Sequence, residues 1–377
     1  MAVGGSLKRF AWRAAALGLI LWGVSGCQGG AAIAPLPEAA PPPGSGTHGA
    51  EAQPRLSFPA PDAWGGEVRC GGGQCRLALV EHEAGFVVLH RFEGRKLREL
   101  ARAKLAYHPD SATWLDGDLL VTAVEAGGTL DVFRTTANGL QRLAQLPMNF
   151  APREALVLGG TGGVHHLLAV PYSGDTVAWL RWRQGAATTE RLQRSVLCKA
   201  PWHPVAVARA PKLPAGGIAV GCLDDRRVMW AAPPDAGLPT RELARFDAVP
   251  RQVQPSPSGR WLYVALETGG RNARIDMDTG AVQFVPSPIE TGVVAVAPLT
   301  DDLVAWSADG RIYLQQLDAA GAVLQTRWLA TSGFGTGLQL IDVDGDGQQD
   351  LLVLNSAGRD SDVIFGPLWE HAQTQQP

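Results

Sequence analysis

Short apolar runs recur along this chain at nearly even intervals. Consecutive runs start 41–51 residues apart, at residues 76, 118, 166, 217, 261, 302 and 350. A polar turn and a second alternating segment follow each run, and in the first six units a third segment follows, for example 281–285. Alternation with a period of two predicts half-buried β-strands, and a multi-strand repeat of about 45 residues is typical of one blade of a β-propeller. We therefore predict an all-β, seven-bladed β-propeller over residues 56–370.

Two tandem β-sandwich domains are the alternative architecture, because they also consist of many short strands. Seven nearly even units favour a single ring. The seventh unit lacks the third segment, and a propeller avoids an open sheet edge when an N-terminal strand completes its last blade. The segment 55–58, with the sequence Arg-Leu-Ser-Phe, is the candidate for this closing strand.

Aromatic and imidazole side chains within the predicted strands have structural interpretations. Large aromatic side chains pack well between neighbouring blades, which is the role we expect for Trp179, Trp230, Trp261 and Trp306. His165 and His166 are adjacent, so on a strand they point to opposite faces and do not share one metal ion. We expect both histidines to lie on the surface or at the rim of the ring.

The composition agrees with a folded β protein. Hydrophobic residues make up 46% of the chain and charged residues 18%, which is too little charge for a disordered chain. The 45 glycines and 27 prolines suit many turns between short strands and disfavour a long helical bundle. A formal net charge of −3 without a basic patch predicts that nucleic acid is not a partner.

The N-terminus has the layout of a bacterial export signal. Three basic residues, Lys8, Arg9 and Arg13, precede an apolar run over 14–24. The run is too short to span a bilayer, which needs about 20 residues. We therefore predict that residues 1–26 are a signal peptide that is removed.

The small residues before Cys27 add an anchor to this prediction. Val24-Ser25-Gly26-Cys27 resembles the lipobox of bacterial lipoproteins, and the resemblance implies that Cys27 carries the lipid. In that family a residue other than aspartate directly after the lipidated cysteine implies transfer to the outer membrane, and Gln28 stands at this position. An ordinary signal peptide with an incidental cysteine is the alternative. Several acyl chains hold a protein durably at a membrane.

Segments at both ends of the predicted ring lack a hydrophobic period. Residues 27–55 are rich in proline, alanine and glycine, which predicts an extended tether between the lipid and the globule. Residues 371–377 are predicted to be a disordered tail.

Four cysteines remain beyond the predicted anchor, an even number for an oxidising compartment. Cys70 and Cys75 flank a glycine-rich turn between two strand-like runs, so they are expected to form a local disulfide. Cys198 and Cys222 then pair by elimination. A zinc site built from all four cysteines is the alternative, but the spacing lacks paired Cys-x-x-Cys motifs.

The segment 341–351, Ile-Asp-Val-Asp-Gly-Asp-Gly-Gln-Gln-Asp-Leu, carries the clearest chemical motif in the chain. Hard oxygen ligands at these spacings, with a glycine at the sharp turn, suit Ca²⁺. Four of the five candidate ligands offer carboxylates and Gln348 offers its backbone carbonyl; the carboxylates are those of Asp342, Asp344, Asp346 and Asp350. An EF-hand is excluded, because Val353 stands where that motif has its bidentate glutamate.

The calcium-type motif continues into a strand and resembles a known repeat. Residues 337–366 resemble the FG-GAP or VCBS repeat of integrin α-like propellers, including the end Val363-Ile364-Phe365-Gly366. The resemblance implies a structural Ca²⁺ held by the loop 342–350. The alternative is an acidic turn that its own Asx hydrogen bonds stabilise without metal.

No catalytic residue is assigned from the sequence, which lacks the G-x-S-x-G and H-E-x-x-H motifs. The leading hypothesis is a lipid-anchored, non-enzymatic binding or scaffold module whose partner is another envelope protein or a glycan. Its layout resembles that of the propeller lipoprotein of the outer-membrane β-barrel assembly machinery. The alternative is a propeller enzyme of lyase, hydrolase or lactonase type with its site in the central channel. Clustered acids, histidines and arginines at the axis would favour the enzyme, and a broad uncharged aromatic face the binding module.

Overall fold

The computed structural model describes residues 54–374 except 138, 187, 212–215, 234–235 and 237–239, and it describes only the backbone of 192 and 194. The described residues belong to one compact unit, Ala50–Pro377. The predicted signal peptide, Cys27 and nearly all of the predicted tether lie outside the described residues. Among the described helices, none is long and apolar enough to cross a membrane.

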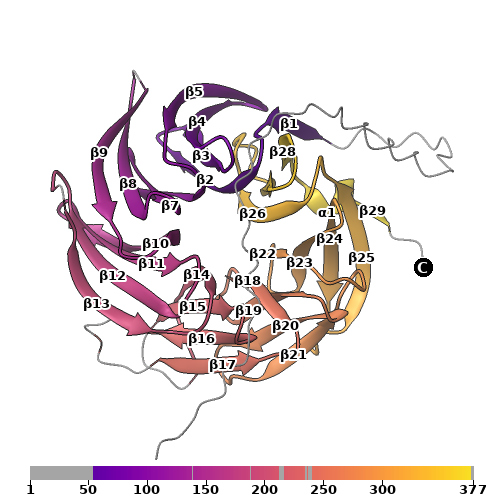
Figure 1. Ribbon diagram of the computed structural model, residues 1–377. Helices are drawn as coiled ribbons and strands as arrows, with labels where there is room; N and C mark the ends of the chain where they lie inside the picture. The colour runs from indigo at the N-terminus through magenta and orange to yellow at the C-terminus, as the bar shows by residue number, and fades with distance from the viewer. Residues whose placement is uncertain are drawn as a thin grey trace, which may run out of the picture. The chain divides into compact units, whose positions relative to one another are not determined.

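The described residues form seven antiparallel sheets that stand around a common axis as the blades of a β-propeller (Figure 1). This arrangement confirms the predicted fold class and excludes tandem β-sandwiches. Blades 1 to 3 consist of β2 (Ala63–Gly71), β3 (Gln74–Glu81), β4 (Phe86–Glu93) and β5 (Lys96–Lys104); β6 (Pro109–Asp116), β7 (Leu119–Val124), β8 (Thr129–Thr136) and β9 (Gly139–Pro147); and β10 (Pro152–Thr161), β11 (Val164–Pro171), β12 (Thr176–Arg183) and β13 (Glu190–Val196).

In every blade the first-named strand lies nearest the axis and the later strands follow outward, and the remaining four blades have the same order. Blades 4 and 5 consist of β14 (Pro201–Val207), β15 (Gly217–Cys222), β16 (Arg227–Ala231) and β17 (Arg241–Arg245); and β18 (Val249–Pro255), β19 (Trp261–Glu267), β20 (Arg271–Asp276) and β21 (Val282–Pro286). Blades 6 and 7 contain β22 (Ala295–Pro298), β23 (Leu303–Ala308), β24 (Arg311–Leu317) and β25 (Val323–Ala330); and β26 (Gly335–Ile341), β27 (Asp350–Asn355) and β28 (Asp360–Ile364).

The N-terminal strand β1 (Arg55–Pro59) closes the ring as the outer strand of blade 7. It pairs antiparallel with β28, with Arg55 opposite Ile364 and Pro59 opposite Asp360. The prediction of the closing strand is therefore confirmed. Phe58, which is 5% exposed, packs in the apolar cluster shared by blades 1 and 7.

A buried carboxylate holds this closing strand. Asp362 on β28 is fully buried and accepts hydrogen bonds from the Ser57 hydroxyl at 2.6 Å and from the Ser332 backbone N–H and hydroxyl at 2.6 and 2.7 Å. The Arg55 guanidinium lies 3.8 Å away. Asp362 therefore joins the closing strand to the loop that leads from blade 6 into blade 7.

The C-terminal segment corrects one prediction. Residues 371–374 are not a disordered tail, because His371 ends the short helix α1 (Leu368–His371) and Gln373–Thr374 form β29, which pairs with β25 as a fifth strand of blade 6. Leu368 and Ala372 are buried in the cluster between blades 6 and 7. Burial of these apolar side chains explains why the segment is ordered. Residues 375–377 lie outside the described part.

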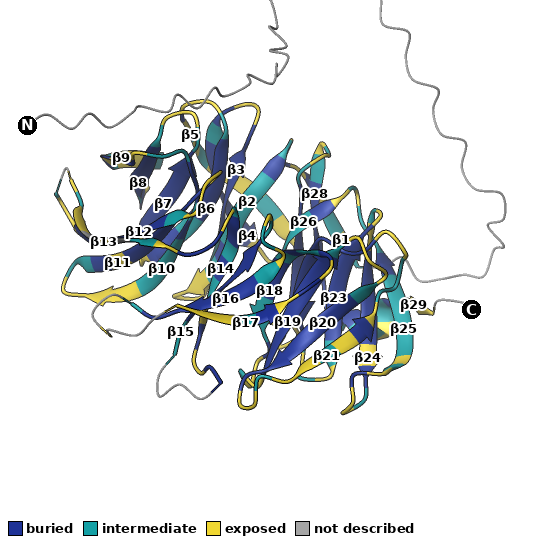
Figure 2. Ribbon diagram, turned by 60° about the horizontal axis from the view of Figure 1, so that its bottom comes forward, coloured by how far each residue is buried: buried dark blue, intermediate teal, exposed yellow. Residues whose placement is uncertain are grey.

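Apolar side chains between neighbouring blades form the core. Figure 2 shows buried strands throughout the ring, with exposed residues in the turns and on outer strands such as β5 and β17. The four tryptophans assigned to the core are at most 4% exposed, which confirms their predicted role, and Trp230 packs with Leu262 of the next blade. His165 and His166 point to opposite faces as predicted, but His165 is 4% exposed and stacks on Trp182. The expectation that both histidines lie at the surface or rim is therefore wrong for His165.

Both predicted disulfides are present, so the four cysteines do not form the alternative zinc site. Cys70 and Cys75 are directly opposite each other on β2 and β3, with their Cα atoms 4.0 Å apart. Cys198, in the loop before blade 4, is bonded to Cys222 at the end of β15, with a Cα separation of 5.8 Å. Both separations are short enough for a disulfide.

Candidate functional site

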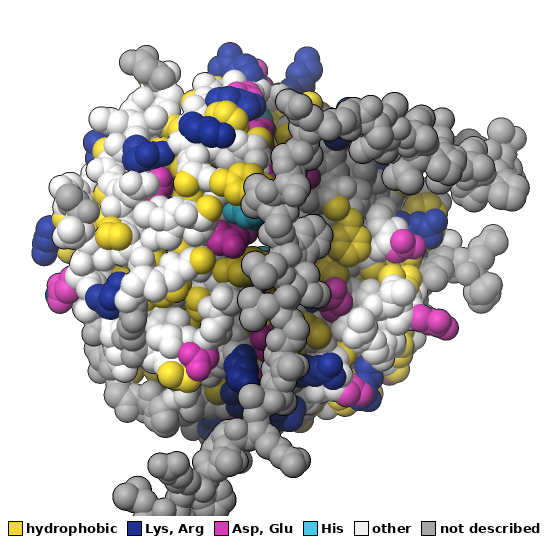
Figure 3. All heavy atoms as spheres, viewed as in Figure 1, with side chains coloured by type: hydrophobic (Ala, Val, Ile, Leu, Met, Phe, Trp, Pro, Cys, Tyr) yellow, Lys and Arg dark blue, Asp and Glu magenta, His cyan; other side chains and the backbone are white. Residues whose placement is uncertain are grey.

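The innermost strands enclose a cavity of about 260 Å³ on the axis. Strands β2, β6, β10, β14, β18 and β26 contribute to its lining, and several of the lining residues are charged or aromatic: Trp64, Glu67, Asp110, Arg153, Trp202 and His203. Figure 3 shows one face of the ring, with histidine and acidic side chains close together near its centre. Ligand sites commonly combine such apolar walls with a few polar groups.

Arg153, at the start of β10, is the central charged group of the cavity. It is 9% exposed, and its guanidinium carbon lies 3.6 Å from the ring centroid of Trp202 and 3.9 Å from that of Tyr172. Its Nε is buried without a hydrogen-bond partner among the described residues. Burial lowers the pKa of Arg153. The charges of Asp110 and Glu154 favour the charged form of Arg153, but neither carboxylate, nor any other described one, forms an ion pair with its guanidinium.

A second arginine extends this arrangement around the axis. The guanidinium carbon of Arg251 lies 4.5 Å from the Trp202 ring, and its Nη1 lies 3.6 Å from a carboxylate oxygen of Glu267. Trp202 therefore contacts two guanidinium groups, which come from blades 3 and 5. Aromatic faces attract cations because of the ring quadrupole, so Trp202 helps to hold positive charge at the cavity.

Two carboxylates beside the cavity have different surroundings. Glu154 accepts a hydrogen bond of 3.0 Å from the His203 backbone N–H, and one of its oxygens lies 3.2 Å from His203 Nδ1. Glu67 accepts one of 2.8 Å from the Trp114 backbone N–H. Burial nevertheless raises the pKa of Glu67, since a low-dielectric environment disfavours its charged form.

Histidines gather beside the same cavity. The rings of His82 and His108 stack with centroids 4.2 Å apart, and Trp64 lies 5.0 Å from His82. Burial opposes the charged form of His82, but the hydrogen bond and charge of Asp110, together with the Pro109 carbonyl and the Glu83 charge, raise its pKa. The axis therefore carries clustered acids, histidines and arginines, the arrangement expected for an enzyme, rather than a broad uncharged aromatic face.

Sequence reasoning missed these residues because it located the three outer strands of each blade and not the innermost one. The signal was present in the segments that start the inner strands. An aromatic-His-Pro sequence occurs at 107–109 and again at 202–204, and Pro-Arg occurs at 152–153 and 250–251. Repetition of these motifs at the same place in different blades predicts that their side chains meet at the axis.

The acidic loop 342–350 lies between β26 and β27. One carboxylate oxygen from each of Asp342, Asp344 and Asp350 lies within 4.8 Å of the other two. Asp346 does not belong to this group. The backbone N–H of Gln348 donates to Asp346 at 2.8 Å. The structure therefore brings together three of the five predicted ligands.

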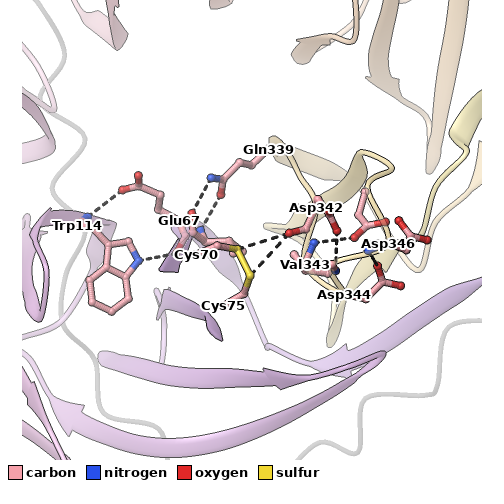
Figure 4. Close-up of a disulfide and its surroundings, with 12 residues drawn as sticks. Glu67, Cys70, Cys75, Trp114, Gln339, Asp342, Val343, Asp344 and Asp346 are labelled. Atoms are coloured by element: carbon pink, nitrogen blue, oxygen red, sulfur yellow. Dashed lines mark hydrogen bonds between the residues drawn. A yellow bond between two sulfur atoms is a disulfide. The ribbon is translucent and has the colours of Figure 1, made fainter. Parts of the chain in front are cut away.

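Backbone donors hold the acidic loop (Figure 4). The two oxygens of Asp342 accept hydrogen bonds of 2.7 and 2.9 Å from the N–H groups of Gly345 and Gly347, and Asp350, fully buried, accepts from Val343 and Gly366. Burial raises the pKa of Asp350, and the charges of Asp344 and Asp346 add to the rise. Asx hydrogen bonds and converging carboxylates thus coexist in this loop.

Blade 1 supplies a cation and a disulfide to the loop. Arg95, in the turn between β4 and β5, lies 2.7 Å from Asp344 and 3.3 Å from Asp346. The hydrogen bond to Asp344 raises the pKa of Arg95. Both sulfur atoms of the Cys70–Cys75 disulfide lie 3.6–3.7 Å from the carbonyl oxygen of Asp342 (Figure 4). Arg95 contacts only two of the four carboxylates of the loop, so the hard-oxygen donor set as a whole still fits a divalent cation such as Ca²⁺.

Comparisons with known proteins identify the fold. No family model and no curated protein matches the sequence. Sqt1 from Saccharomyces cerevisiae has a TM-score of 0.62 and 11% identity, over 83% of this chain and 98% of that one. A virginiamycin B lyase from Staphylococcus aureus has a TM-score of 0.59 and 10% identity, over 83% and 99%. A 6-phosphogluconolactonase described as putative, from Bacteroides uniformis, has a TM-score of 0.54 and 16% identity, over 71% and 84%. At such identities the similarity shows the β-propeller fold alone.

Proposed function

We propose that this protein is a lipid-anchored envelope β-propeller whose central cavity binds a small anionic ligand. The observation that carries the proposal is Arg153, whose guanidinium is buried between two aromatic rings and has no carboxylate partner among the described residues. Removing a charge from water without a partner costs several kcal/mol. A ligand that brings a negative charge supplies the missing partner.

The chemistry of the cavity narrows the ligand class. A guanidinium binds planar carboxylates and phosphates through parallel hydrogen bonds. The volume of about 260 Å³ is just below the usual range of drug-sized ligand sites. Trp64, Tyr172 and Trp202 provide apolar and aromatic surface near this cation. We therefore propose a small carboxylate or phosphate that also carries an apolar or ring group.

Arg153→Met tests this proposal. The variant retains an apolar stem between the aromatic rings and removes the charge, so we expect the affinity for anions to fall about 10–150-fold, as for the loss of a charged hydrogen bond. Calorimetric titration with a panel of mono- and dicarboxylates and with inorganic phosphate measures the change. Arg311→Met is the matched control, because Arg311 lies over Trp328 on blade 6, outside the cavity. Equal anion binding by Arg153→Met and the unmodified protein would refute the proposal.

A lyase or lactonase that acts on such an anion is the second candidate, favoured by the Glu154–His203 pair. A carboxylate that holds an imidazole in place is a common arrangement of a general base, and structural neighbours include a lyase and a lactonase-like protein. Mass spectrometry of anions incubated with the protein tests this candidate. Turnover that Glu154→Gln abolishes while anion binding persists would support an enzyme, and unchanged anions would support the binding module.

We further propose that the signal peptide is removed and that a lipid on Cys27 holds the protein at the outer membrane. The support is the lipobox-like sequence, which is followed by the proline-rich segment predicted as a tether over 27–55, at whose last residue, Arg55, the first strand begins. The loop face around the cavity is then free to meet an envelope protein or glycan.

Cys27→Ser is expected to release the protein from membranes, because no other anchor is evident from the sequence and acyl chains supply the binding energy. Membrane fractionation of cells that produce either form measures the effect. A serine variant that remains in the membrane fraction would show that something other than a lipid retains the protein.

We also propose that the loop 342–350 is an FG-GAP/VCBS-like calcium site with a structural role. Its support is the convergence of Asp342, Asp344 and Asp350 and the motif spacing. Asp346 and the Gln348 carbonyl are the further ligands that the motif implies. Since the loop contacts Arg95 and the Cys70–Cys75 disulfide, bound calcium would strengthen the junction between blades 7 and 1.

A further inference from the structure

His82, Glu83 and His108 form a compact cluster beside the cavity, separate from the acidic loop. One ligand-type atom of each residue lies within 4.8 Å of those of the other two. His82 Nε2 lies 4.0 Å and His108 Nε2 3.6 Å from Oε1 of Glu83. His82 follows β3 and His108 precedes β6, so the cluster joins blades 1 and 2.

The other polar atom of each side chain is directed to a group outside the cluster. His82 Nδ1 lies 3.2 Å from the Pro109 carbonyl oxygen and 3.3 Å from an Asp110 oxygen, so Nδ1 is the donor and Nε2 keeps its lone pair. The Tyr107 hydroxyl donates to Oε2 of Glu83 at 2.6 Å, which leaves Oε1 available. Metal-ligating side chains are typically held through their other atoms in this way.

His108 is also held through its other ring nitrogen. His108 Nδ1 lies 3.8 Å from a Glu125 carboxylate oxygen, and Nε2 is buried without a hydrogen-bond partner among the described residues. Asp110, which faces His82, also has a buried oxygen, Oδ2, without such a partner. Three ligand atoms therefore lie within reach of one another, and the side chains that carry them are held through their other atoms.

We propose that His82, Glu83 and His108 bind a divalent transition metal of the zinc class. Two imidazoles and one carboxylate are a ligand set that Zn²⁺ takes, with a fourth position open. A tetrahedral ion with bonds of about 2.0–2.2 Å separates its ligands by about 3.3–3.6 Å. The stacked rings of His82 and His108 direct their nitrogen lone pairs nearly parallel, so rotation of the half-buried His108 ring is the movement that would aim both Nε2 atoms at one ion.

The metal site would border the proposed anion site without depending on it. Asp110 and Trp64 line the cavity and also contact His82. Anion binding that Arg153→Met leaves unchanged, which would refute the anion site, and absence of zinc binding, which would refute the metal site, are therefore separate results.

Calorimetric titration of the full chain with Zn²⁺ tests the site, in buffer with millimolar Ca²⁺ so that the acidic loop does not take up zinc. We expect one zinc per chain and loss of this binding in His108→Ala. Tyr107→Phe removes only the hydroxyl that orients Glu83, so the zinc affinity is expected to fall about 10–100-fold. His166→Ala, which removes an exposed histidine of blade 3, is the control and is expected to bind like the unmodified chain.

Two results would overturn the proposal: absence of zinc binding by the unmodified chain, or binding that His108→Ala and Tyr107→Phe leave unchanged. Circular dichroism of each variant shows whether the propeller is intact. If His108→Ala fails to fold, zinc binding by Tyr107→Phe still tests the proposal. Tyr107 is 54% exposed, so removal of its hydroxyl should not unfold the ring.

Discussion

Asp362→Ala is expected to lower the free energy of unfolding by about 3–5 kcal/mol, because it removes the buried carboxylate that fastens the closing strand. Ser57 and Ser332 lose their acceptor, and the Ser332 backbone N–H loses its partner as well. A buried donor left without a partner costs about 1–3 kcal/mol. Denaturant unfolding of the purified protein measures the change.

Two further variants separate ring closure from a general effect of charge. Asp362→Asn keeps an oxygen acceptor for Ser57, but its amide NH₂ group then faces the donors of Ser332. We therefore expect a loss in the free energy of unfolding that is smaller than that of Asp362→Ala. Asp360→Ala lies two residues away on β28, and no hydrogen bond or ion pair joins its side chain to the described residues. We expect this control to change stability by less than about 0.5 kcal/mol. Equal losses for Asp360→Ala and Asp362→Ala would contradict the role of Asp362 in closure.

Calcium is expected to raise the melting temperature, since binding to the folded loop alone stabilises the fold by about 2.7 kcal/mol at 100 times the dissociation constant. Asp344→Ala should remove most of this rise, because it deletes one of the converging carboxylates. Melting curves in chelator and in millimolar calcium, for both proteins, measure the difference. A transition in the unmodified protein that calcium does not shift would show that the loop is only an acidic turn.

The structure refines what is expected without calcium. Sequence spacing indicated only repulsion among the carboxylates, whereas Arg95 lies 2.7 Å from Asp344 and offsets part of it. Arg95→Met should therefore lower stability in chelator and increase the affinity for calcium, because a competing cation is gone. Arg98→Met, in the same hairpin but paired with Glu93, is the control. If Arg95→Met and Arg98→Met respond alike, Arg95 does not compete with calcium.

Periodicity along the chain was sufficient to predict the outer strands and the closure. Each apolar run buries side chains against a neighbouring blade. Because successive side chains of a strand point to opposite faces, this burial gives apolar residues a period of two in every unit. The closing strand was predicted because a missing outer strand leaves an unpaired edge that some other segment must cover. The pairing of Cys70 with Cys75 was also predictable, because only a short loop separates the two cysteines.

The innermost strands and the site were not predictable in the same way. Strands such as β14 and β18 carry prolines and polar side chains that face the channel, so their apolar alternation is interrupted. Glu154 and His203 meet across 49 residues because each is the third residue of the innermost strand of its blade, and the two blades are adjacent. Which side chains contact one another at the cavity therefore depends on how the blades pack into the closed ring.

The sequence by itself determined the repeat and the number of blades, because burial leaves a periodic pattern in each unit. The missing strand of the last unit indicated the closing strand, the short loop indicated the Cys70–Cys75 disulfide, and Cys198 and Cys222 followed by elimination. Only the tertiary structure decided that Arg153 is a buried cation without a carboxylate, that His82 faces His108, and that Arg95 reaches the acidic loop from 249 residues away. Side chains from distant segments meet at the axis and at the junction of the first and last blades, and their distances are set when all seven blades pack into a closed ring.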